Sequence, residues 1–158
     1  MKIISTLIVF FAFTKLSLAD TYEFEASGKI ISNDSIELKK GFEKSIVVSE
    51  STWTDNNGDY GIVLCLGTID KFLDKSVILN LACSGRNQDG EKFTGNIVRK
   101  SDTQDAGVGI FSYVNGTGKF KRLIGRKCNL AVKYIEEFSY YFLPNTNSSI
   151  YVCISNCS

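Results

Sequence analysis

The sequence predicts an all-β fold, an antiparallel barrel or sandwich of about eight strands. Apolar and polar residues alternate from Thr21 onward, which is typical of strands with one buried face. Short segments rich in Gly, Asn and Asp interrupt the alternation at 55–58, 87–90 and 115–118. The chain has 13 glycines and one proline, and this composition suits short strands joined by turns.

The N-terminal residues have the pattern of an export signal. Lys2 is followed by an apolar run, 3–13, and then by small residues up to Ala19. The run is shorter than the roughly 20 apolar residues that a membrane-spanning helix needs. We therefore expect residues 1–19 to be a signal peptide cleaved near Ala19. Residues 20–158 should form a single β-barrel domain, periplasmic or secreted, with no membrane span.

The first predicted strand shows the alternation most clearly. Its positions 22, 24, 26, 28 and 30 are apolar or small and share one face, whereas 23, 25, 27 and 29 are polar. The further predicted strands are 44–52, 59–69, 76–85, 91–100, 107–115, 126–134, 138–143 and 150–154.

The segment 107–125 carries a specific turn signal. Two alternating runs flank Asn115-Gly-Thr-Gly118, and Asn-Gly tolerates the positive φ angles of a tight hairpin. The pattern predicts two adjacent antiparallel strands joined at this turn.

Five cysteines in an exported chain predict disulfides. In a hairpin centred on Asp74, Cys65 and Cys83 lie directly opposite each other, at a Cα spacing of about 4.5–5.5 Å that a disulfide accepts. Cys128 then pairs with Cys153 or Cys157 and tethers a C-terminal tail. The predicted disulfide residues are Cys65, Cys83, Cys128 and Cys153, with Cys157 as the alternative to Cys153. A further alternative pairs Cys153 with Cys157 and leaves Cys128 free.

Charge and composition exclude several classes of function. The formal net charge is +1 and histidine is absent, so the overall positive charge typical of nucleic-acid binding, the usual general base and the commonest metal ligand are all lacking. The segment 55–59 resembles the start of a calcium loop, but Tyr60 and Leu66 occupy the positions that require Gly and Glu. We predict no nucleic-acid partner, no metal and no cofactor, and we assign no catalytic residue.

The plentiful aromatic residues suggest what the interior could hold. About eight strands enclose a space just wide enough for side chains or one small ligand. Most aromatic rings should be core, and a subset lining a cavity would favour an apolar ligand. The candidate ligand-binding residues are Trp53, Tyr60, Phe111, Tyr113 and Tyr134.

The later part of the chain resembles the allene oxide cyclase and dirigent barrel group. The segment 115–125, followed by the apolar run 130–135 and the aromatic run 138–142, is similar to the Gly-Thr/Ser-Gly-x-Phe turn and following strands of that group. The resemblance implies an eight-stranded antiparallel up-and-down barrel with a central cavity. Plant members of the group bind hydrophobic substrates and direct cyclisation or coupling without cofactors. The earlier strands do not match, so no catalytic residue carries over.

Three functions remain open from the sequence. The leading expectation is an exported barrel that binds a small apolar or amphipathic ligand in its interior. The alternatives are a cofactor-free isomerase or cyclase on the same barrel, and a filled barrel that acts as an envelope interaction or structural module. The absence of histidine favours a binding protein over an enzyme. The sequence does not specify the oligomeric state.

Overall fold

The chain forms eight strands and one short helix. The structure is a computed structural model that describes residues 21–103, 106–135 and 150–157. A 3₁₀ helix, η1 (Gly118–Leu123), lies between the sixth and seventh strands. The strands are β1 (Tyr22–Lys39), β2 (Phe42–Asp55), β3 (Tyr60–Phe72), β4 (Val77–Asn87), β5 (Lys92–Ser101), β6 (Ala106–Gly116), β7 (Lys127–Ile135) and β8 (Ile150–Cys157).

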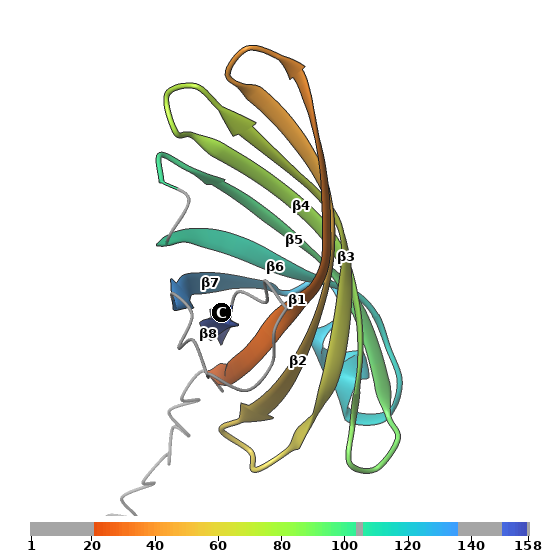
Figure 1. The fold of residues 1–158 in the computed structure, drawn as a ribbon. Coiled ribbons are helices and arrows are strands. Elements are labelled where there is room, and N and C mark those ends of the chain that lie inside the picture. Colours follow the sequence, from red (N-terminus) through yellow and green to blue (C-terminus); the bar gives the residue numbers. More distant parts are fainter. Residues whose placement is uncertain (1–20, 104–105, 136–149, 158) are drawn as a thin grey trace, which may run out of the picture.

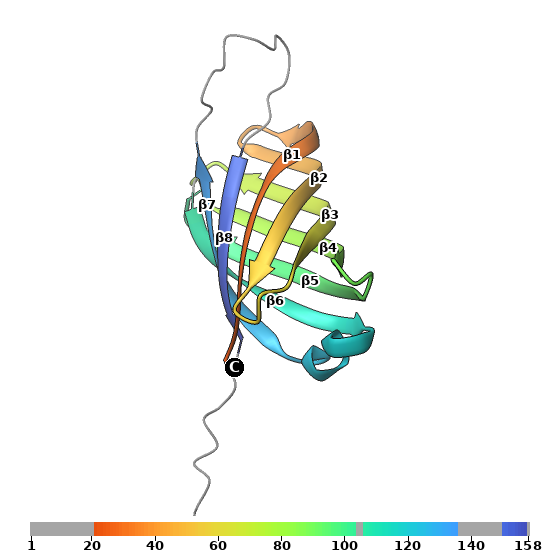
Figure 2. The same cartoon turned by 90° about the horizontal axis from the view of Figure 1, so that it is seen from below.

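The eight strands make one closed ring (Figures 1 and 2). Each strand pairs antiparallel with its neighbours in sequence, and β1 also pairs with β8. The expected all-β antiparallel fold is confirmed, as a ring rather than as two stacked sheets. At one end lie η1 and the β2–β3 and β4–β5 turns, which we call the η1 end. The β1–β2 and β3–β4 turns lie at the opposite end, the hairpin end.

The first two strands are longer than the sequence predicts. Register shifts between Ile30 and Ser32 and between Glu37 and Lys39 let β1 continue its pairing with β2 as far as the turn at the hairpin end. At that end Phe42 and Phe72 stack with ring centroids 5.1 Å apart. β1 and β2 therefore extend well beyond the predicted strand ends.

The predicted tight hairpin at 115–118 is wrong. β6 ends at Gly116, but the following residues form η1, and the next strand begins only at Lys127. In a 3₁₀ helix residues i and i+3 share one face, and Phe120 and Leu123 are both buried in the core at the η1 end. A strand would place these two side chains on opposite faces, so their burial requires the helical turn.

One predicted disulfide pairing is confirmed, and the choice that the sequence left open for Cys128 falls on Cys157. Cys65 and Cys83 are opposite each other in β3 and β4 and form a disulfide. Cys128 of β7 pairs with Cys157, not with Cys153. The reason is register, because Cys157 lies directly opposite Cys128, whereas Cys153 lies opposite Val132. The predicted C-terminal tail is β8, the strand that closes the ring.

Two predicted segments fall outside the described residues, namely the signal peptide 1–19 and the strand 138–143. Within the ranges that the structure describes, none of the helical segments has the length and apolar character needed to span a membrane.

The core fills the ring as two adjoining clusters. The larger cluster, at the η1 end, is rich in aromatic side chains and includes Trp53, Phe93 and Phe120. The smaller cluster, toward the hairpin end, consists of Val47, Ile69, Val77 and Leu79.

Candidate ligand site inside the ring

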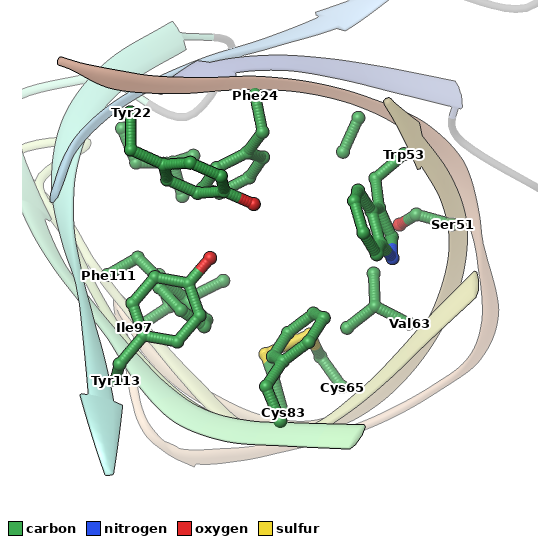
Figure 3. Close-up of a pocket in the computed structure, with 13 residues that line it drawn as sticks. Tyr22, Phe24, Ser51, Trp53, Val63, Cys65, Cys83, Ile97, Phe111 and Tyr113 are labelled. Atoms are coloured by element: carbon green, nitrogen blue, oxygen red, sulfur yellow. A yellow bond between two sulfur atoms is a disulfide. The ribbon is translucent and has the colours of Figure 1, made fainter. Parts of the chain in front are cut away.

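The interior retains two apolar cavities. The first lies within the aromatic cluster and has a volume of about 50 Å³ (Figure 3). The second lies toward the hairpin end and has a volume of about 40 Å³. Cys65, Ile97 and Leu130 line both cavities. The first is lined by Tyr22, Phe24, Ala26, Ser51, Trp53, Val63, Cys65, Cys83, Phe93, Ile97, Phe111, Tyr113 and Leu130.

Alternation along the strands brings the aromatic side chains inward. Phe111 and Tyr113 are two residues apart on β6, and their rings pack edge to face with ring centroids 4.7 Å apart. Glycine on the neighbouring strands makes room for the rings, because a Cβ at Gly85 would collide with the ring of Phe93, and one at Gly95 with that of Phe111. The wall of the first cavity is therefore a tightly packed aromatic surface.

Two tyrosine hydroxyls supply polar groups in the otherwise apolar first cavity. Figure 3 shows the hydroxyls of Tyr22 and Tyr113 directed toward each other inside the ring. Burial is the main cause that raises the pKa of Tyr22, and Tyr113 and Asp55 raise it further. Burial also raises the pKa of Tyr113, and its hydrogen bond with Tyr22 acts in the opposite direction. Both phenols therefore stay protonated at neutral pH. The single hydroxyl hydrogen of Tyr22 is engaged by Tyr113 and Asp55, so Tyr113 is the better placed of the two to donate a hydrogen bond to a ligand.

The wall of the second cavity is mostly aliphatic and includes one buried, positively charged residue. Arg99 lines it and is 2% exposed. Its Nε and Nη2 donate to Ser101 Oγ, at 3.0 and 2.8 Å. Nη2 also donates to the carbonyl oxygens of Thr103 and Ala106, at 2.8 and 2.7 Å. These bonds hold the guanidinium against the wall of the ring.

The volumes limit what the interior can hold. One water needs roughly 10–15 Å³ of such space, so each cavity has room for a few atoms of water size. Pockets for drug-sized ligands measure about 300–1,000 Å³. Side chains therefore fill most of the ring, and a ligand must be small or narrow, or must displace a side chain.

The predicted site residues divide into three groups. Trp53, Phe111 and Tyr113 line the first cavity. Tyr60 does not, because its side chain is on the outer face of β3 and is exposed. Tyr134 lies in β7, but its side chain is outside the described part of the structure.

Sequence reasoning missed several lining residues. Tyr22, Phe24 and Ala26 share the apolar face that the alternation of the first strand indicates, so that pattern could have placed them in the site. Phe93 is a single apolar residue in an alternating strand, and Leu130 begins the apolar run 130–135. No local signal separates either residue from ordinary core residues.

A charge network fastens η1 to the neighbouring turns. Lys119 Nζ is 2.7 Å from Asp59 Oδ1, 3.3 Å from Asp89 Oδ2 and 4.0 Å from Glu91 Oε2. Gln88 Nε2 also donates to Asp59 Oδ1, at 2.7 Å. The hydrogen bond from Lys119 is the main cause that lowers the pKa of Asp59.

Replacing Lys119 with methionine should lower the free energy of unfolding near neutral pH. The loss should be small, because the lysine is partly exposed and water screens its ion pairs. A lowered carboxyl pKa stabilises the fold above the unfolded-state value, about 3.9 for Asp, and this contribution is lost as the pH falls through the folded-state pKa. Urea denaturation should therefore show the difference between wild type and Lys119→Met shrinking below about pH 4. Lys121→Met, at an exposed position of η1, is the control and should change little. An equal loss for Lys119→Met at acid pH would contradict the role of Asp59.

Comparison with known proteins adds no relative. No protein-family model matches the chain, and no curated protein matches it. Among the residues that the structure describes, no group of three His, Cys, Asp or Glu side chains is placed to hold a metal ion.

Proposed function

We propose that this protein is exported and that its ring binds a small apolar or amphipathic molecule in the interior. The observation that carries the proposal is the first cavity, an apolar space walled by aromatic rings into which two tyrosine hydroxyls point. Apolar walls with a few placed polar groups are the usual make-up of a small-molecule site. The two disulfides support export, since such bonds persist in oxidising compartments.

The lining indicates the class of ligand. An apolar body matches the aromatic and aliphatic wall, and a hydrogen-bond acceptor such as a carbonyl oxygen matches the hydroxyl of Tyr113. A narrow chain running past Ile97 and Leu130 could occupy both cavities. Such a ligand would bring its far end toward the guanidinium of Arg99, which suits an amphipathic molecule.

A cofactor-free cyclase or isomerase, as in the allene oxide cyclase and dirigent group, is the second candidate. Its support is the resemblance of residues 107–142 to that group and the pair of tyrosine hydroxyls. The residues that line the first cavity include no Asp, Glu, Lys, Arg or His. Neutral phenols with raised pKa values are weak proton-transfer groups near pH 7, so the lining favours binding over acid–base chemistry.

The small cavity volumes favour the third candidate, a filled ring that works through its outer surface.

The candidates differ in a measurable property, because only a binding protein must carry or take up a ligand. Native mass spectrometry of the exported protein, with organic extraction of anything released, separates them. A stoichiometric apolar adduct is the expected result. A clean protein mass, with no thermal shift across a panel of short alkyl and aromatic carbonyl compounds, would overturn the binding proposal.

Filling the first cavity should abolish binding. Ala26 lines the cavity from β1, so Ala26→Leu places its larger side chain where a ligand would lie. We expect at least about a tenfold loss of affinity, with an overpacking cost of about 1–3 kcal/mol in stability. Ser27→Leu, at the exposed neighbouring position, should bind as the wild type does. Equal binding by both variants would place the ligand elsewhere.

A further inference from the structure

The third strand is apolar on both faces. Its inner residues Val63 and Cys65 pack in the ring's core. On the outer face Tyr60, Ile62, Leu64 and Leu66 are 59%, 41%, 45% and 54% exposed. A strand with one solvated face normally alternates apolar with polar residues, whereas a continuous apolar run is typical of a strand covered on both sides. The sequence of β3 is therefore that of a strand with a covered outer face.

The neighbouring strands extend this surface. Val48 of β2 and Ala82 of β4 lie on either side of Leu66. We call the surface made by Val48, Ile62, Leu64, Leu66 and Ala82 the outer β3 face. Figure 1 shows β2, β3 and β4 side by side and curved along their length. Toward the η1 end the surface is hollowed by a groove of about 630 Å³, lined in part by Tyr60, Ile62 and Arg86.

Opposite charges border the outer β3 face on its two sides. Glu50 of β2 lies opposite Leu64, and Arg86 of β4 lies opposite Ile62. Both charged residues are exposed. A surface with an apolar centre, an acid on one side and a base on the other can complement a rotated copy of itself, as an isologous interface requires.

We propose that the outer β3 face binds the same face of a second copy of this chain, about a two-fold axis that runs along β3. This arrangement lays β2 of one copy over β4 of the second copy, as in the aligned packing of two sheets. Val48 meets Ala82 of the second copy, and Leu64 meets its own equivalent. Glu50 lies diagonally across from Arg86 of the second copy, two residues away along the strand direction, within reach of these two long side chains. The symmetry of the dimer forms this charge pair twice.

The arrangement of apolar and charged residues on β2, β3 and β4 favours a second copy over an unrelated partner. On the register of the three strands, Val48 faces Ala82 and Leu64 faces its equivalent. Glu50, level with Leu64, lies diagonally across from Arg86, which is level with Ile62. The dimer buries the exposed apolar surface that a strand such as β3 would otherwise present to water. The contact uses only the outer face, so it leaves the interior cavities unchanged.

The test is the molar mass in solution, measured by light scattering and sedimentation velocity. We expect the wild-type protein to have twice the mass of one chain and Leu64→Glu to have the mass of one chain. Val108→Glu is the matched control, because Val108 is 63% exposed on the outer face of β6. It should remain a dimer. Circular dichroism and melting temperature confirm that each variant is folded.

The charge pair provides a second test that needs no apolar substitution. Glu50→Arg and Arg86→Glu should each weaken the dimer by roughly tenfold, and the double variant should recover the wild-type affinity. A wild-type monomer would overturn the proposal. A dimer that survives Leu64→Glu, or that Val108→Glu dissociates equally, would also overturn it. The proposal would also be overturned if the double variant Glu50→Arg/Arg86→Glu did not recover the dimer affinity that each single variant loses.

Discussion

Replacing Phe120 with alanine should lower the free energy of unfolding by about 3–5 kcal/mol, the usual cost of deleting a buried phenyl ring. Phe120 is 1% exposed, and its ring centroid lies 5.0 Å from that of Phe93 and 5.9 Å from that of Trp53. These contacts attach η1 to the aromatic cluster, so the loss should appear as a lower midpoint of denaturation in guanidinium chloride.

The control for this prediction is Ile124→Ala, one residue beyond η1, because Ile124 is exposed. Its effect should stay within about 0.5 kcal/mol. The Phe120→Ala variant also gains a phenyl-sized space beside an apolar wall, and such spaces bind benzene. Benzene should therefore raise the melting temperature of Phe120→Ala more than that of the wild type. A loss below about 1 kcal/mol would mean that Phe120 does not hold η1 in the core.

The second large effect should come from removing the Cys128–Cys157 disulfide. The bond closes a loop with a sequence separation of 29 residues, and the double variant Cys128→Ala/Cys157→Ala should lose about 3–4 kcal/mol. The two sulfurs are fully buried and join β7 to β8 near the η1 end. Removing the Cys65–Cys83 disulfide, with a separation of 18 residues, should cost slightly less, about 3 kcal/mol.

Thiol titration of the denatured protein checks the pairing itself. Four of the five cysteines form the two disulfides, so the wild type should give one free thiol and Cys153→Ser none. If Cys128 instead pairs with Cys153, the variant Cys153→Ser will give two free thiols. The substitution thus separates the two pairings without a structure of the variant.

Local pattern predicts the parts of this fold that depend on neighbouring residues. The Cys65–Cys83 disulfide follows from the sequence because a hairpin centred on Asp74 determines which residues lie opposite each other. Trp53 lines the interior, and the polar residues on either side of it, Thr52 and Thr54, show the alternation of a strand with one buried face. Tyr60 lies on the outer face of β3. Because β3 is apolar on both faces, alternation carries no information about which of its residues face inward.

The missed features depend on distant contacts. The Asn115-Gly116 pair indicates a hairpin, but Phe120 contacts Phe93 of β5 and Lys119 pairs with Asp59 in the β2–β3 turn. These distant contacts determine η1. The choice of Cys157 over Cys153 depends on the register of β8, which is set by pairing with β1 and β7. Residues far apart in sequence decide both features, so a window of neighbouring residues cannot predict them.

The pairing of β1 with β8 has a consequence for how the chain folds. Asn156 Nδ2 donates to Glu23 Oε1 across 133 residues of sequence, so closing the ring brings together two segments from opposite ends of the domain. Contacts of such long range slow folding, because the entropy of closing the loop is lost before the contacts form. The edges of β1 and β7 stay open until β8 docks between them, and open edges pair readily with other chains. Folding should therefore be slow and aggregation-prone until β8 joins the ring.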